Sequence, residues 1–338
     1  MIILNLTPSD LVEMRFAYSP LLEISLSRRM MLHAHPQIGY GRWLDEAFHA
    51  LHGITLPYMD ALLESPHFIV DFLTPTPAIT GQTIDDELEI LRHTDAATIR
   101  ANIHRLLEYH RAHCDKAPDY VPRMDILCEY LESPTSSVER LIGELRLYWN
   151  LTLAHHWSRL TAILDGDVLH RARQMALYGA ESVLQELHPE VFYEDGKIVL
   201  HKGYRGKQPA EYDLNGKGLQ LVPIMFAAEK FYWQVTEPYL PMLIYGPRGI
   251  GNWSGNPTPN NESLEVVMGV GRARILQTLR TPANTGEMAT RLQLTAGAVS
   301  QHLNKLREAG LVEPHRSGRR VYYHLTERGE QLLTLFTT

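Results

Sequence analysis

Apolar residues recur at helical spacing along most of the first 190 residues. The pair Ser19-Pro20 is a typical start for a helix, which we expect to continue to about Leu32. The same spacing predicts further helices over residues 43–51, 86–92, 95–110, 124–131, 136–164 and 167–187. The N-terminal part of the chain is therefore expected to be mostly helical.

The pattern changes after residue 190. Residues 191–193 and 198–201 are rich in apolar and aromatic side chains, and Asp195-Gly196 lies between them, which predicts a β-hairpin. Residues 6–17 favour neither helix nor strand. Further strand candidates are residues 219–227 and 239–245. We therefore predict an α+β fold that is mostly helical, with a small β element in the N-terminal domain.

Two short helices are predicted near the C-terminus. Thr285 can cap the first, in which Met288 and Leu292 are apolar. Leu294 is expected to close this helix, and Thr295 to cap the next one. The two helices would then be joined by a tight turn.

The second of these helices is expected over about residues 296–309. Val299, Leu303 and Leu306 fall on one of its faces, which should therefore be buried. Gly310 can adopt the left-handed conformation that ends many helices. The spacing thus predicts a helix with one face in a core and the other in solvent.

A basic hairpin follows this helix. We expect a strand to begin at residues 311–312, a tip at 316–320 and a returning strand at 321–325. The tip reads RSGRR and contains three arginines. Helix, turn, helix, glycine and basic hairpin follow each other in the order of a winged helix-turn-helix, which reads DNA in the major groove. An ordinary helical hairpin is the alternative, but it would leave the basic hairpin unexplained.

The outward face of the second helix carries short polar side chains and no acidic residue before Glu308. Such side chains suit contacts with base edges and phosphates. The residues predicted to contact DNA from this helix are Thr295, Gly297, Ser300, Gln301, Asn304 and Lys305. Those predicted in the wing are Arg316, Arg319 and Arg320.

The C-terminal segment resembles the ArsR-type family of bacterial transcriptional regulators. The resemblance rests on GRARIL at 271–276, VSQHL at 299–303, LREAGLV at 306–312 and GRRVYY at 318–323. The resemblance implies a winged helix-turn-helix fold, DNA binding and repression of transcription.

The region before it is similar to a long uncharacterised domain found ahead of the winged helix in one subgroup of that family. The similar motifs are FAYSPL at 16–21, LHP at 187–189, LVP at 221–223 and YGPRG at 245–249. This resemblance implies no particular ligand.

Many members of the family sense metals, but the ligands of their two usual sites are missing here. Residues 285–291, on the first helix of the pair, contain no Cys or His, and residues 327–336 contain two carboxylates and no His. The chain has 17 histidines, of which several are close in sequence. These clusters are His33 with His35, His49 with His52, His110 with His113 and Cys114, and His155 with His156. We interpret them as solvated or helix-capping residues, and we expect neither a metal nor a cofactor.

Charge is unevenly distributed along the chain. Residues 262–338 contain 10 Lys and Arg against 7 Asp and Glu, a net charge of +3, whereas residues 1–261 have a net charge of −10. Residues 246–262 are rich in Gly, Pro and Asn and are interpreted as a linker. We therefore predict a sensory or dimerisation domain over residues 1–245 and a DNA-binding domain over residues 263–338. The acidic domain should lie away from DNA.

No apolar run is long enough to span a bilayer, the N-terminus has no signal-like core, and the two cysteines fit a reducing cytosol. Aromatic residues gather between positions 226 and 245, with others at 148, 149 and 157, and either core packing or an organic-ligand pocket would explain them. Core packing is the favoured interpretation.

We expect a cytoplasmic, homodimeric regulator that binds double-stranded DNA, with an unknown small-molecule effector acting through the N-terminal domain. Two alternatives remain open. The N-terminal domain could be a small-molecule enzyme or ligand-binding domain fused to a regulatory winged helix, or the winged helix could serve protein contacts. The sequence contains no recognisable catalytic motif, and residues 246–251 lack the Lys-Ser/Thr of a phosphate-binding loop.

Overall fold

The structure is a computed structural model that describes residues 1–33, 40–65, 68–77, 80–113, 120–201, 210–227, 230–248, 262–317 and 320–335. Its contacts define two compact units. The first comprises residues 1–35, 47–154 and 170–246, and the second comprises residues 36–46, 155–169 and 247–338. Helices predominate and the strands form small sheets, which confirms the predicted α+β class. Most of the predicted linker, residues 249–261, lies outside the described residues.

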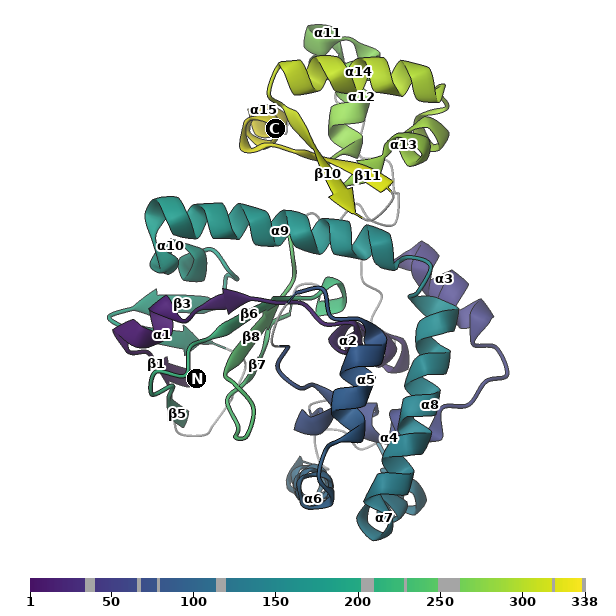
Figure 1. Ribbon diagram of the computed structural model, residues 1–338, viewed down its shortest axis with the longest axis vertical. Coiled ribbons are helices and arrows are strands. Elements are labelled where there is room, and N and C mark those ends of the chain that lie inside the picture. The colour runs from purple at the N-terminus through teal and green to yellow at the C-terminus, as the bar shows by residue number, and fades with distance from the viewer. Residues whose placement is uncertain are drawn as a thin grey trace. The chain divides into compact units, whose positions relative to one another are not determined.

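The helical part of the first unit is built around one long helix, α8, which packs against five others (Figure 1). The central helix α8 spans Pro134–Thr152. Its five partners are α2 (Pro20–Leu32), α4 (Pro57–Leu63), α5 (Ile84–Arg92), α6 (Ala96–His113) and α7 (Met124–Glu132). Ser19 caps α2 by accepting a hydrogen bond from the Leu22 N–H, as its sequence predicts. Helix α3 spans Gly41–Ala50.

Two helix breaks differ from the sequence-based expectation. The helix predicted over residues 136–164 is interrupted by a turn at residues 153–156, after which α9 runs over Trp157–Tyr178. The helix predicted over residues 167–187 breaks at Gly179, whose φ of +85° favours glycine, and α10 spans Ala180–Gln185. Apolar side chains keep helical spacing across the first break, so the sequence contains no stop signal there.

One four-stranded sheet of the first unit has the order β3-β4-β1-β5. Asp195 and Gly196 have φ values of +50° and +75° between β3 and β4, which is the backbone of the predicted two-residue hairpin turn. Strand β1 pairs antiparallel with β4 and parallel with β5, so the N-terminus joins segments about 200 residues away. The strands are β1 (Ile2–Asn5), β3 (Val191–Glu194), β4 (Lys197–Leu200) and β5 (Ala210–Asp213).

A second four-stranded sheet has the order β2-β6-β8-β7, in which β2, β6 and β8 are parallel and β7 is antiparallel. Its strands are β2 (Arg15–Phe16), β6 (Gln220–Pro223), β7 (Tyr232–Gln234) and β8 (Met242–Tyr245). A short helix, α1 (Pro8–Val12), lies between β1 and β2 in the chain. Residues 6–17 therefore contain both helix and strand, which explains why their pattern favours neither.

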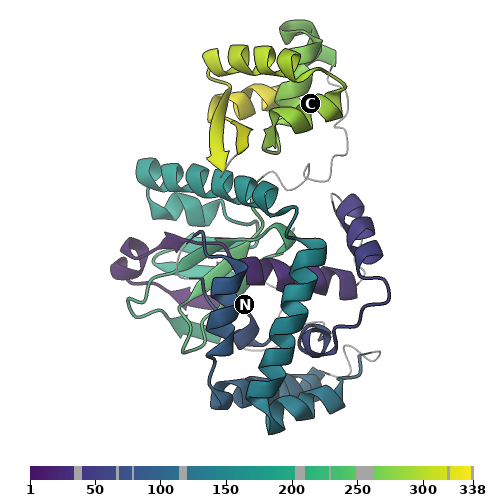
Figure 2. The same ribbon diagram turned by 45° about the vertical axis from the view of Figure 1, so that its right-hand side comes forward.

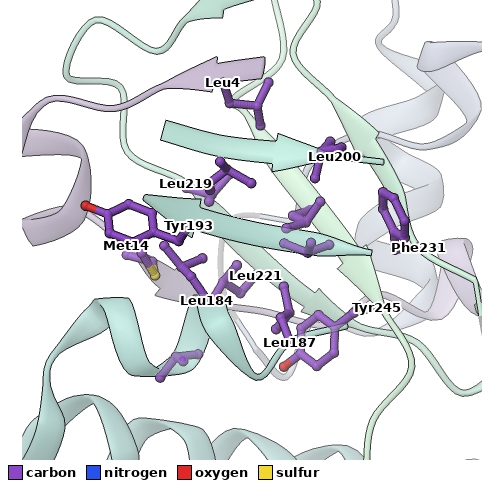
Figure 3. Packing of buried hydrophobic residues seen from close by; sticks show 14 of the residues in the cluster. Leu4, Met14, Leu184, Leu187, Tyr193, Leu200, Leu219, Leu221, Phe231 and Tyr245 are labelled. Carbon is purple, nitrogen blue, oxygen red and sulfur yellow. The ribbon is translucent and has the colours of Figure 1, made fainter. Parts of the chain in front are cut away.

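The two sheets and α10 share one hydrophobic core (Figure 3). Leu4 and Leu200 come from the first sheet, Leu221 and Tyr245 from the second, and Leu184 from α10, and none of them is exposed by more than 1%. Each fully buried leucine contributes about 1.5–3 kcal/mol of hydrophobic stabilisation. This core holds together segments from the start, middle and end of the first unit.

Buried carboxyl groups in the first unit should make its stability depend on pH. Glu23 accepts backbone N–H bonds from Met225 and Phe226, and Glu87 accepts hydrogen bonds from the Leu21 N–H and the Ser19 hydroxyl. Burial raises the pKa of Glu23 to about 8 and that of Glu87 to about 7. Both groups favour the protonated form in the folded chain, because burial penalises the charged form.

These two groups should contribute most to the free energy of unfolding below about pH 4.5. Their contribution should fall as the pH rises towards 7 for Glu87 and 8 for Glu23. The slope should approach about 1.4 kcal/mol per pH unit for each group between its unfolded and folded pKa. Urea denaturation at several pH values would measure it. Glu23→Gln should flatten the dependence, whereas Glu194→Gln, at an exposed position in β3, should leave it unchanged. An equal dependence in all three proteins would contradict this prediction.

Candidate nucleic-acid interface

Residues 262–335 form the elements of a winged helix. Helix α14 lies along one side of this domain, and the paired strands β10 and β11 extend beside it (Figure 1 and Figure 2). Strand β9 completes a three-stranded sheet of order β10-β11-β9. The elements are α11 (Glu262–Met268), α12 (Val270–Thr278), β9 (Ala283–Asn284), α13 (Thr285–Leu292), α14 (Ala296–Glu308), β10 (Val312–Ser317), β11 (Arg320–Leu325) and α15 (Glu327–Leu335).

Helix α13 begins one residue away from the predicted cap. Asn284, not Thr285, is the capping residue: its side chain accepts the Glu287 N–H at 3.0 Å, and the Glu287 side chain accepts the Asn284 N–H at 3.2 Å. The reciprocal pair satisfies two backbone donors at once, which explains why Asn284 takes the position. Gln293 then ends α13 in the left-handed conformation, with φ of +55°. This tight turn leads directly into α14.

Helix α14 has the predicted start and the predicted buried face. Thr295 caps it by accepting the Ala298 N–H at 3.2 Å. Val299 and Leu303 are fully buried and Leu306 is 1% exposed, so these three side chains fix α14 in the hydrophobic core of the domain. Because one face of α14 is held in the core, the opposite face must point towards solvent.

The end of α14 is also fixed by backbone hydrogen bonds. Gly310 has φ of +68°, as the sequence predicts, and its N–H donates to the Arg307 carbonyl. The Leu311 N–H donates to the Leu306 carbonyl, which together with the first bond forms the Schellman arrangement. Leu311 is buried beside Leu306 in the same core. The chain therefore leaves α14 in a defined direction and enters the wing.

A close approach between α12 and α14 depends on a glycine. A Cβ at Gly271 would lie 2.6 Å from Nε2 of His302, so a larger residue would force the two helices apart or displace the imidazole. His302 is half-buried and faces α12. This histidine therefore has a packing role between the helices, and the exposed face of α14 is formed by its neighbours.

All six residues of α14 and its cap that were predicted to contact DNA are exposed. Gln301 lies nearly opposite the buried face, because it is two residues from Val299 and Leu303 on a helix of 3.6 residues per turn. Its long amide side chain can donate and accept hydrogen bonds at the same time. The exposed residues are Thr295, Gly297, Ser300, Gln301, Asn304 and Lys305.

The wing strands pair in register from Val312 with Leu325 to Ser317 with Arg320. Arg316 and Arg320 are exposed at the far end of this pairing, while Arg319 lies outside the described residues. Within the described part of the chain, Lys305, Arg316 and Arg320 form no ion pair. Three positive charges are thus available to an anionic partner such as a phosphate backbone.

Arg307 is a further exposed cation that the sequence-based selection left out. It lies seven residues after Ser300, so two helical turns place both on the same edge of α14. The spacing from Ser300 and the positive charge were the signals that could have identified it.

The aromatic residues of the first unit mostly pack in its interior, in line with the favoured interpretation. Phe231 and Tyr245 are 1% and 0% exposed. Tyr239 instead borders a surface groove of about 930 Å³, which is also lined by Asp86, Glu89 and Asp95. This groove is acidic and open, so it is not the aromatic-lined pocket for an organic ligand that was the alternative to core packing.

A family described as "Helix-turn-helix domain" matches residues 272–315, from α12 to β10. No curated protein and no solved structure matched the chain. None of the described helices has the length and apolar character needed to cross a lipid bilayer. Sequence comparison and geometry therefore agree that the C-terminal part of this chain contains a helix-turn-helix domain, a module typical of DNA-binding regulators.

Proposed function

We propose that this chain is a sequence-specific DNA-binding transcriptional regulator of the ArsR type. The observation that carries the proposal is the division of α14 into a fully buried apolar face and an exposed polar face next to a basic wing. A helix with this division can enter the major groove with its polar face towards the bases while the wing contacts the backbone.

The proposal includes a homodimer in the cytoplasm that represses transcription. One recognition helix reads only a few base pairs, and two-fold symmetric operators supply the missing specificity. Repression follows from the family resemblance of the motifs in α12, α14 and the wing. The acidic first unit is repelled by phosphate and should therefore stay away from DNA. We assign to it the remaining roles of the regulator, which are dimerisation and effector binding.

A regulator accounts for the charged residues better than the alternatives do. A protein-contact module would leave Lys305, Arg316 and Arg320 exposed without a function, whereas a phosphate backbone pairs with all three. An enzymatic role for the N-terminal unit would require a catalytic arrangement that its sequence motifs do not supply. We therefore propose that the chain is not an enzyme.

The proposal is tested by measuring binding of the full chain to DNA from its own upstream region and to random DNA. We expect tighter binding to the upstream fragment, two chains per site, and affinity that falls with salt. Analytical ultracentrifugation of the complex would give the number of chains. Equal affinity for both DNAs at every salt concentration would contradict a sequence-specific regulator.

Gln301→Ala should weaken operator binding by about 1–3 kcal/mol, because a glutamine amide can form two hydrogen bonds with one adenine. Affinity for random DNA should stay the same. Gln331→Ala is the matched control, since Gln331 is an exposed glutamine of the same domain that lies on α15 and not on α14. Fluorescence anisotropy with both DNAs would measure the effect. Equal losses on operator and random DNA would mean that Gln301 reads no base.

A further inference from the structure

Three potential metal-ligating side chains from two separate parts of the chain come together in the second unit. Glu46 lies on α3, and His155 and His156 lie in the turn before α9. One ligand atom from each residue lies within 4.8 Å of the other two. Nε2 of His156 is 3.4 Å from a carboxylate oxygen of Glu46, and the two imidazole centroids are 4.0 Å apart.

The turn is held by backbone hydrogen bonds. The N–H groups of Leu153 and Ala154 both donate to the Trp149 carbonyl, which ends α8. The carbonyl of His156 accepts the N–H groups of Arg159 and Leu160, which starts α9. The two histidines therefore stand between two helices on a backbone whose course is fixed at both ends.

Glu46 is positioned by the packing of α3. Its neighbours Trp43 and Ala47 are each 2% exposed, so they anchor this helix and leave Glu46 at the surface. Arg42, one helical turn earlier, donates to the Glu46 carboxylate at 2.9 Å. The Arg42 side chain is 79% exposed and can move into solvent when a cation takes its place.

Two imidazoles and a carboxylate form a ligand set that suits zinc and other first-row divalent ions. With bonds of about 2.0–2.1 Å, ligand atoms in a tetrahedral site lie about 3.4 Å apart. Small side-chain rotations therefore bring the present arrangement to bonding distance. Three protein ligands leave a fourth position for water.

We propose that Glu46, His155 and His156 bind a divalent first-row transition-metal ion, for which Zn²⁺ is the natural probe. The three proposed ligands lie outside α14 and the wing strands. The sequence shows the His155-His156 pair but gives no reason to associate it with a carboxylate 109 residues earlier. The fold supplies that third ligand.

The test is a calorimetric titration of the metal-free full chain with Zn²⁺, followed by a Co²⁺ titration monitored by visible absorption. We expect one ion per chain at this site. His156→Gln and Glu46→Gln should each weaken Zn²⁺ binding by more than about 100-fold, since even outer-shell changes cost 10–100-fold. His49→Gln is the matched control, because His49 is an exposed histidine on the same helix.

Circular dichroism would show that each variant keeps its helices. The Glu46→Gln result is decisive, because a chain with 17 histidines can bind zinc at imidazoles elsewhere. Absence of Zn²⁺ binding by the unmodified chain would overturn the proposal. Binding of equal strength in the unmodified chain and in the Glu46 and His156 variants would overturn it as well.

Discussion

Leu303→Ala should destabilise the winged helix by about 2–5 kcal/mol, the usual cost of removing a large buried side chain. Leu303 is fully buried on α14 among Val299, Leu306 and Met288, all 1% exposed or less. Hydrogen exchange of the α14 amides is the appropriate measurement, because the chain contains two units and global unfolding need not be two-state. Exchange should be at least about 30-fold faster, since each 1.4 kcal/mol corresponds to a factor of ten.

Gln301→Ala gives the matched comparison for this experiment. It removes a side chain of similar length from the exposed face of the same helix. We expect it to leave α14 exchange nearly unchanged, because exposed substitutions outside special sites usually change stability by less than about 0.5 kcal/mol. The two variants should thus separate folding from DNA recognition. If Leu303→Ala exchanged at the same rate as the unmodified chain, the proposed packing of α14 would be wrong.

Simultaneous replacement of Lys305, Arg316 and Arg320 by alanine should weaken binding to every DNA sequence. If all three contact phosphates, the slope of log affinity against log salt should decrease by about 2.7, or 0.9 for each contact. Such a change corresponds to a loss of about 100-fold or more near physiological salt. The measurement is a salt titration of binding to operator and random DNA. The preference for the operator should change less than the affinity.

A control variant removes the same total charge from the acidic first unit. Arg173, Lys197 and Lys217 are exposed there, and their replacement by alanine makes the net charge of the chain equally more negative. We expect only a small decrease in affinity, because salt screens charges beyond roughly 10 Å at 0.1 M. Equal salt slopes for the two triple variants would show that net charge alone, without the wing and α14, governs binding.

The winged helix could be predicted largely from local sequence. Thr295 and Gly310 mark the two ends of α14, and Val299, Leu303 and Leu306 specify its buried face, because caps and helical periodicity act between residues a few positions apart. The α13 cap was misplaced by one residue. Asn284 and Thr285 are both good caps, and only the reciprocal bond with Glu287 distinguishes them.

The same local reasoning predicted the hairpin at Asp195-Gly196 and the cap at Ser19. Periodicity predicted most of the longer helices before residue 190, but it missed α4 and left residues 6–17, which contain α1, undecided. It also did not place the helix breaks, since α9 runs unbroken through residues 165–166, where one predicted helix ended and the next began. The turn at residues 153–156 carries no Gly or Pro, so nothing in the local sequence opposes a continuous helix there. In the folded chain, the N–H groups of Leu153 and Ala154 both donate to the Trp149 carbonyl and end α8 at this turn.

Long-range pairing was beyond the reach of the sequence by itself. Strand β1 pairs with β4 and β5, and the buried Glu23 accepts hydrogen bonds from Met225 and Phe226. The Glu46, His155 and His156 cluster is of the same kind. Local sequence determined the helices, caps and hairpins, because their hydrogen bonds join near neighbours. Tertiary structure decided the partners of β1, the burial of Glu23 and the third metal ligand, because each depends on contacts between residues that only the folded chain brings together.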